Sequence, residues 1–94
     1  MTAPLNHGTI TVGTTAYQLT APANWKRALL KLSNNSGSAT IYVGDGTVTS
    51  SGVTQGFPIP ANNKDSFEVT SNSPLNVIAS AASTSVSYIW TAAL

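Results

Sequence analysis

The sequence predicts an all-β fold, a single small antiparallel sandwich or barrel of about seven or eight short strands. Three observations support this. Apolar and polar residues alternate with a period of two along most of the chain, clusters of Gly, Pro, Asn and Ser interrupt that alternation at short intervals, and no stretch has a convincing helical period. The pattern leaves a jelly-roll-like and an immunoglobulin-like strand order open.

The first half of the chain contains four predicted strands, most of which place two or three apolar residues on one face. The turn signals APAN and NNSGS, which flank the third segment, disfavour a helix there. The segments are residues 8–12 with Ile10 and Val12, residues 16–20, residues 26–33 with Ala28, Leu30 and Leu32, and residues 39–43 with Ile41 and Val43.

The second half contains three more alternating segments. They are residues 65–70 with Phe67 and Val69, residues 75–80 with Leu75, Val77 and Ala79, and residues 85–92 with Val86, Tyr88 and Trp90. Between the halves, Pro58 and Pro60 flank Ile59, and two missing N–H donors exclude a central strand. We expect an edge strand there, or a loop that inserts Phe57 and Ile59 into one end of the sandwich.

The length of 94 residues fits one domain, residues 1–94, without an internal repeat or linker. The first seven residues, MTAPLNH, do not alternate and contain a proline, so a loose N-terminal arm is expected. No apolar stretch approaches the ~20 residues that cross a bilayer, and no basic start precedes an apolar run. We therefore expect synthesis in a host cytoplasm and no membrane partner.

Charged side chains are unusually rare. They make up 7% of the residues, with a formal net charge of +1, against about 25% in an average domain. So weak a field does not steer nucleic acid, which is not expected as a partner. A small core without cysteine gains stability by association, so the surface is predicted to contact other protein. The alternative is a Ser/Thr/Asn-rich surface that water hydrates.

The reactive side chains are few and scattered. His7, the sole histidine, has no carboxylate or nucleophile near it in the sequence. Residues 44–47 (GDGT) carry one carboxylate, too few for a calcium loop, and lack the Gly-Lys-Ser/Thr of a phosphate loop. Asp65 and Glu68 fall on opposite strand faces, which does not suit a glycosidase pair. We expect no enzyme, no cofactor and no metal.

Two sets of residues are candidates for a protein interface. Trp25, Arg27, Leu29 and Lys31 share one strand face, and Trp and Arg are enriched at interface centres. The alternatives are a solvated strand face with Trp25 over the rim, and RNA stacking on Trp25 or Tyr42, for which the electrostatics are weak.

The second set is Phe57 and Ile59, two apolar anchors on a proline-stiffened backbone after a Gly/Ser/Thr-rich loop. Such a loop can order on a partner surface. The two anchors are expected either to seal the protomer core or to bury against a sister subunit.

The sequence from Arg27 to the last strand resembles small tailed-bacteriophage structural proteins. The resemblance rests on an Asn-Ser turn, an IYVG strand, a Gly-hydrophobic-Pro segment and a PL-x-x-IA strand. The matching residues are Asn34 and Ser36, Ile41–Gly44, residues 56–59 and residues 74–79.

The resemblance implies a head decoration (cement) protein on the capsid surface of a virion. Such proteins bind the major capsid protein, often as homotrimers, and have no active site. This chain departs from those decoration proteins that have a long N-terminal arm. A tail or neck assembly protein is an alternative. Another is a receptor- or glycan-binding module of a tail fibre or spike, with Tyr42 near Asp45 or Trp90 near Asn76 as the sugar platform.

Overall fold

The computed structural model describes residues 5–20, 27–70 and 75–92. These residues form eight strands and one 3-10 turn, and none of their helices is long or apolar enough to cross a membrane. The elements are β1 (Leu5–Val12), β2 (Tyr17–Leu19), β3 (Arg27–Asn34), β4 (Ile41–Gly44), η1 (Gly52–Thr54), β5 (Phe57–Ile59), β6 (Lys64–Thr70), β7 (Leu75–Ala79) and β8 (Thr84–Ala92).

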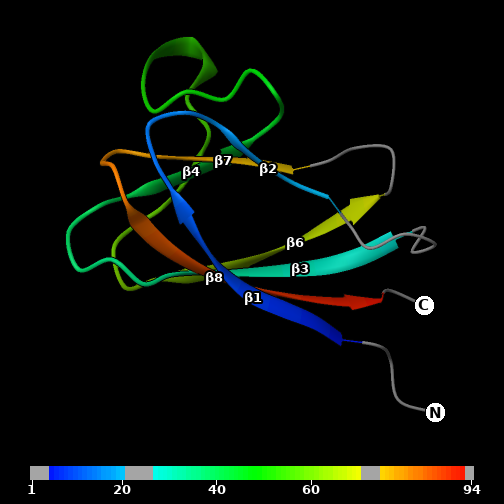
Figure 1. The fold of residues 1–94 in the computed structure, drawn as a ribbon. Helices are drawn as coiled ribbons and strands as arrows, with labels where there is room; N and C mark the ends of the chain where they lie inside the picture. The colour runs from blue at the N-terminus through cyan, green and yellow to red at the C-terminus, as the bar shows by residue number, and fades with distance from the viewer. Residues whose placement is uncertain (1–4, 21–26, 71–74, 93–94) are drawn as a thin grey trace.

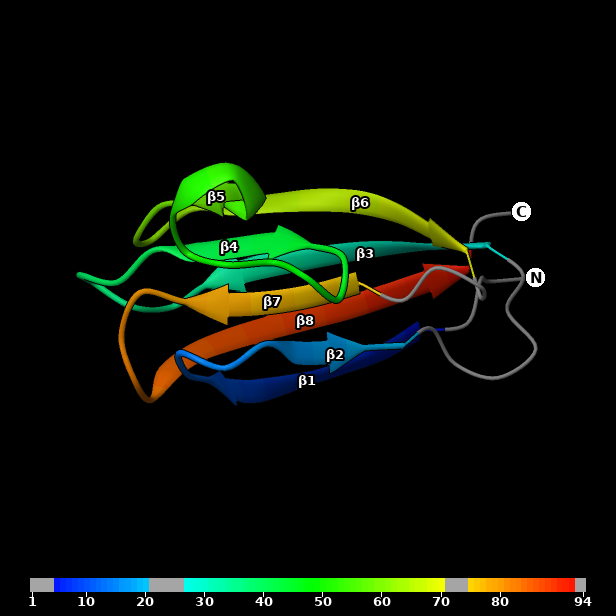
Figure 2. The same cartoon turned by 90° about the horizontal axis from the view of Figure 1, so that it is seen from above.

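The strands form two four-stranded sheets that pack face to face (Figures 1 and 2). Their orders are β1-β8-β3-β6 and β2-β7-β4-β5, called here the first and the second sheet, and every pair is antiparallel. The chain pairs its first strand with its last, its second with its seventh, and so on inward. This nested pairing is a jelly roll. The predicted all-β sandwich is confirmed, and the strand order is the jelly-roll one.

The alternation in the sequence correctly identifies the core between the sheets. In β3, buried and exposed residues alternate, and Ala28, Leu30 and Leu32 are fully buried. Ile10, Phe67 and Tyr88 are partly buried and pack against this core. The buried cluster is Val12, Leu19, Ala28, Leu30, Leu32, Ile41, Val43, Ile59, Val69, Leu75, Val77, Ala79, Val86 and Trp90.

Part of the stretch predicted as a loose arm, residues 1–7, belongs to a strand instead. Residues 5–7 belong to β1, where Leu5 lies opposite Thr91 and His7 opposite Ile89. An edge strand is held by backbone pairing to one neighbour, so it does not need the apolar alternation that this stretch lacks. Residues 1–4 lie outside the described residues.

Strand β7 is buried on both of its faces, which its alternating sequence did not predict. Leu75, Val77 and Ala79 face the core as expected, but Asn76 and Ile78 are also buried, on the outer side of the second sheet. Figures 1 and 2 show that the segment between β4 and β5 folds back over the outer face of this sheet.

Candidate functional site

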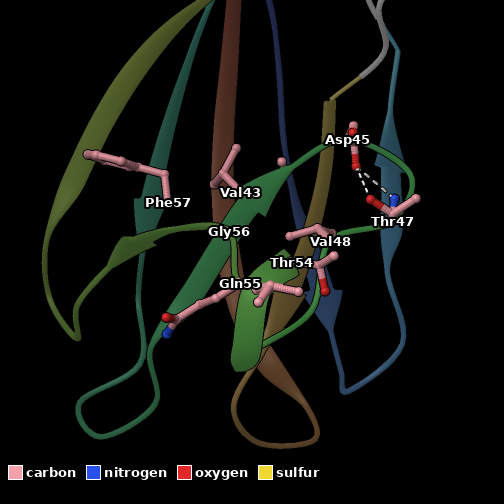
Figure 3. A pocket seen from close by; sticks show the side chains of 10 residues that line it. Val43, Asp45, Thr47, Val48, Thr54, Gln55, Gly56 and Phe57 are labelled. Atoms are coloured by element: carbon pink, nitrogen blue, oxygen red, sulfur yellow. Dashed lines mark hydrogen bonds between the residues drawn. The ribbon is translucent and has the colours of Figure 1, made fainter.

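The segment between β4 and β5 forms an open groove of about 370 Å³ with the ends of those two strands (Figure 3). Its lining combines four apolar side chains, several hydroxyl and amide groups, and one carboxylate. The lining residues are Val43, Gly44, Asp45, Thr47, Val48, Val53, Thr54, Gln55, Gly56 and Phe57.

Val48 anchors this segment to the sheet. Its side chain is 6% exposed and lies over Gly44 and Gly56, where the absence of a Cβ leaves room for it. Backbone hydrogen bonds close the segment on itself, since the Thr49 N–H donates to the Thr54 O at 3.0 Å and the Gly56 N–H to the Thr49 O at 3.1 Å. Gly52 has φ +82°, a conformation that favours glycine. The groove is therefore built on ordered backbone.

Asp45 is the one carboxylate of the groove, and its own turn engages it. Its Oδ1 accepts hydrogen bonds from the Thr47 Oγ1 at 2.6 Å and from the Thr47 N–H at 2.8 Å. The side-chain bond, and then the backbone bond, lower the pKa of this exposed carboxyl from its ordinary value of 3.8.

The turn should therefore be held most firmly with Asp45 ionised. The pKa of Asp45 is lower in the folded than in the unfolded chain. The stability that the two hydrogen bonds add is therefore fully present above pH 3.8 and is lost as the pH falls through the lower, folded pKa. NMR titration of the Thr47 amide should give a midpoint below 3.8, and Thr47→Ala should move that midpoint upward. A midpoint at or above 3.8 in the unmodified protein would contradict the effect of these bonds.

Two exposed apolar side chains flank the groove. Val53 at the η1 tip is 105% exposed, and Phe57 is 56% exposed. The Phe57 ring makes a T-shaped contact with the Phe67 ring on β6, with centroids 6.1 Å apart and planes at 82°, so it bridges the two sheets at one open side. Sequence reasoning missed Val53, although it is the sole apolar residue between Val48 and Phe57.

The predicted pair of anchors divides between core and surface. Ile59 is 2% exposed and belongs to the core, so it seals the protomer. Phe57 stays largely open, on the free edge of the second sheet that the flanking prolines predicted for β5.

The first set of predicted interface residues, Trp25, Arg27, Leu29 and Lys31, is called here the cationic stripe. Its described residues lie on the outer face of the first sheet, on the opposite side of the sandwich from the groove. Arg27, Leu29 and Lys31 are all exposed there, as their shared strand face predicts. The Arg27 Nε lies 3.6 Å from Glu68 Oε1, and both side chains are more than half exposed, so this ion pair contributes little stability. Trp25 lies outside the described residues.

The reactive side chains are distributed over different parts of the fold. His7 lies on β1 opposite Ile89, whereas Asp45 lies in the loop over the other sheet. Within residues 5–20, 27–70 and 75–92, no three His, Asp or Glu side chains gather as metal ligands would.

One sugar platform considered from the sequence is wrong. Trp90 is 2% exposed and packs in the core, so it offers no surface for stacking a sugar ring. Tyr42 lies on the outer side of the second sheet beside Ile78 and is partly buried.

No family model matches the chain, and no curated protein matches it. One solved structure is similar, a chain from Bacillus endospore appendages, which form a family of disulfide-linked pili. The similarity covers 96% of this chain and 85% of that chain, with a TM-score of 0.59 and 22% sequence identity. At that identity, the similarity supports the fold alone.

Proposed function

We propose that this chain is a non-enzymatic structural protein of a bacteriophage virion. In this proposal it decorates the assembled capsid by binding the major capsid protein through the groove between β4 and β5. One observation carries the proposal. Of the four large apolar side chains exposed in the described residues, two, Val53 and Phe57, flank a single groove that contains one charge.

The physical basis is a surface ordered before it binds. Phe57 rests on Phe67 and precedes a proline, and hydrogen bonds fix the loop that presents Val53. Docking therefore orders few additional groups, which lowers the entropic cost of binding. The hydroxyl and amide groups around the two anchors suit a polar rim that hydrogen-bonds to a partner backbone.

The bacteriophage resemblance involves the walls of this groove. Its matching segments include Ile41–Gly44, which is β4, and residues 56–59, which are Gly56 and the whole of β5. A capsid surface is a protein partner of the kind that two apolar anchors in a weakly charged groove would suit.

The pilus chain that shares this fold belongs to a structural assembly, and we extend only that broad class, a structural protein that assembles with other subunits, to this chain as part of the proposal. Disulfide linkage, which describes those pili, is not available here because the chain has no cysteine. Any assembly of this chain is therefore non-covalent or uses chemistry other than thiols.

Capsid binding tests the proposal directly. Capsids that lack this protein are mixed with the purified chain and sedimented, and the bound fraction is measured against concentration. The wild type should saturate at a fixed stoichiometry. The double variant Val53→Ser/Phe57→Ser should bind at least about tenfold more weakly, because each anchor loses its buried apolar area.

The matched control is Leu29→Ser, which removes a side chain of similar exposure, 44%, from the opposite face. It should bind as the wild type does. Loss of binding in Leu29→Ser alone would assign docking to the cationic stripe. If the purified chain does not bind capsids but binds glycans on an array, the protein is a receptor-binding module instead.

A further inference from the structure

The hydrogen-bond pattern of the first sheet shows which backbone groups its edge strands turn outward. The Asn34 N–H donates to the Asn63 O at 2.9 Å, and the Asn35 N–H donates to the Ser85 O at 3.0 Å. Because antiparallel residues alternate between neighbours, even residues of β3 bond to β6 and odd residues bond to β8. The same alternation makes even residues of β8 bond to β1.

Strand β1 therefore directs the N–H and C=O groups of its odd residues away from the sheet. These residues are Leu5, His7, Thr9 and Thr11. Elsewhere in the described residues, no loop carbonyl or side chain accepts a hydrogen bond from the N–H of His7, Thr9 or Thr11. The strand has neither proline nor Asp, Glu, Lys or Arg, so it lacks the usual features that block strand addition.

Each of the other three edges carries a feature that disfavours strand addition. On β6, the outward N–H of Ser66 is occupied by the Asp65 Oδ1 at 2.8 Å, and charged Lys64 and Glu68 flank it. On β5, the outward residue is Pro58, which has no N–H. Strand β2 has three residues and turns only Gln18 outward. Among the described strands, β1 alone is a long edge with neither a charged residue, a proline nor a side-chain cap on its outward N–H groups.

We infer that β1 pairs with β1 of a second copy of this chain, joining the first sheets of two protomers into one continuous sheet. Two copies of this edge can pair in antiparallel orientation, because the outward residues lie at equal distances in sequence on either side of Gly8. With Gly8 opposite the partner's Gly8, Leu5 pairs with the partner's Thr11 and His7 with the partner's Thr9. Each of the four resulting pairs supplies two backbone hydrogen bonds.

This pairing places no like charges opposite each other, which would destabilise a strand pair. A closed trimer would instead need β1 to pair with a different edge of the next copy. The other long edge, β6, is capped by Asp65. The edge chemistry therefore favours a two-fold dimer over the homotrimer that the bacteriophage resemblance implies, whichever larger assembly the chain joins.

Sedimentation equilibrium of the full chain tests this inference. The wild type should reach twice the 9.7 kDa chain mass as its concentration rises. Thr9→Pro removes an outward N–H from each copy without removing a bond to β8, so the dimer should weaken by about tenfold or more. The matched control Glu68→Pro removes an outward N–H from the β6 edge, and it should dimerise as the wild type does. Circular dichroism checks that both variants keep their β-content.

Two charge variants test the register and do not depend on proline being tolerated. His7→Lys/Thr9→Lys places lysines opposite each other across the two-fold axis, whereas His7→Glu/Thr9→Lys places opposite charges there. The first variant should dimerise about tenfold more weakly than the second, and added salt should reduce this difference in dimer affinity. A monomer at every concentration, a trimer mass, loss of the dimer in Glu68→Pro alone, or equal affinities of the two charge variants would overturn the inference.

Discussion

Replacing Asn34 with alanine should lower the free energy of unfolding by about 3 kcal/mol or more. The Asn34 side chain is 1% exposed, and its Nδ2 donates to the Ala39 O at 2.9 Å and to the Ile59 O at 3.0 Å. Its Oδ1 accepts from the Ser36 N–H at 3.1 Å. One side chain thus ties the end of β3 to the following turn and to β5 in the other sheet. Alanine would leave those backbone groups without this partner.

The matched control for this variant is Asn63→Ala. Asn63 is exposed, and its Nδ2 makes one hydrogen bond, to the Ala61 O at 3.0 Å. This change should cost less than about 1 kcal/mol, since water replaces the lost partner. Urea unfolding followed by fluorescence of the buried Trp90 measures both variants. Equal stability losses would show that Asn34 does not have this bridging role.

Replacing Gly56 with alanine should cost about 3 kcal/mol and loosen the groove. A Cβ on Gly56 would lie 2.5 Å from Val48 Cγ2, 2.7 Å from the Val43 O and 2.8 Å from the Val43 N. Val48 could move, but the Val43 backbone belongs to the β4–β5 pair and cannot yield without breaking it. The variant must therefore displace either the loop or β5.

Gly46→Ala is the control for this variant within the same segment. An added Cβ there meets nothing within 4 Å, so stability should change by less than about 0.5 kcal/mol. Thermal unfolding compares the two proteins, and the Thr47 and Val53 amide shifts report the loop. A Gly56→Ala protein as stable as Gly46→Ala, with unchanged shifts, would contradict the close packing described here.

The sequence predicted the core well because core positions follow a local rule. Two-residue alternation identified Leu30, Val77 and Val86 without knowledge of their neighbours. The flanking prolines likewise identified β5 as an edge strand. The nested strand order was not predictable in this way, because it depends on pairing between strands far apart in the sequence, as β1 with β8.

The candidate site was predicted only in part, for the same reason. The anchors were identified as a pair, but whether each points into the core depends on the sheet opposite, which buries Ile59 and leaves Phe57 open. The burial of Asn76 and Ile78 does not follow from the alternation in β7, because that pattern does not say what lies outside the sheet. The bridging role of Asn34 appears only when the turn and β5 are placed beside β3.

The groove and the β1 edge are separate surfaces of one sandwich. The groove lies over the second sheet beside β5, whereas β1 is the far edge of the first sheet. Docking through one therefore leaves the other available. A dimer formed through β1 would present two grooves, which favours binding to a repetitive protein surface by raising the effective concentration of the second contact.

The proposed role as a capsid decoration protein is tested most directly by electron cryo-microscopy of virions purified from cells that express the gene for this chain. We predict copies of the jelly roll on the outer capsid surface, with Val53 and Phe57 turned toward the major capsid protein. A particle without this chain, or one that holds it with the groove open to solvent, would contradict the account.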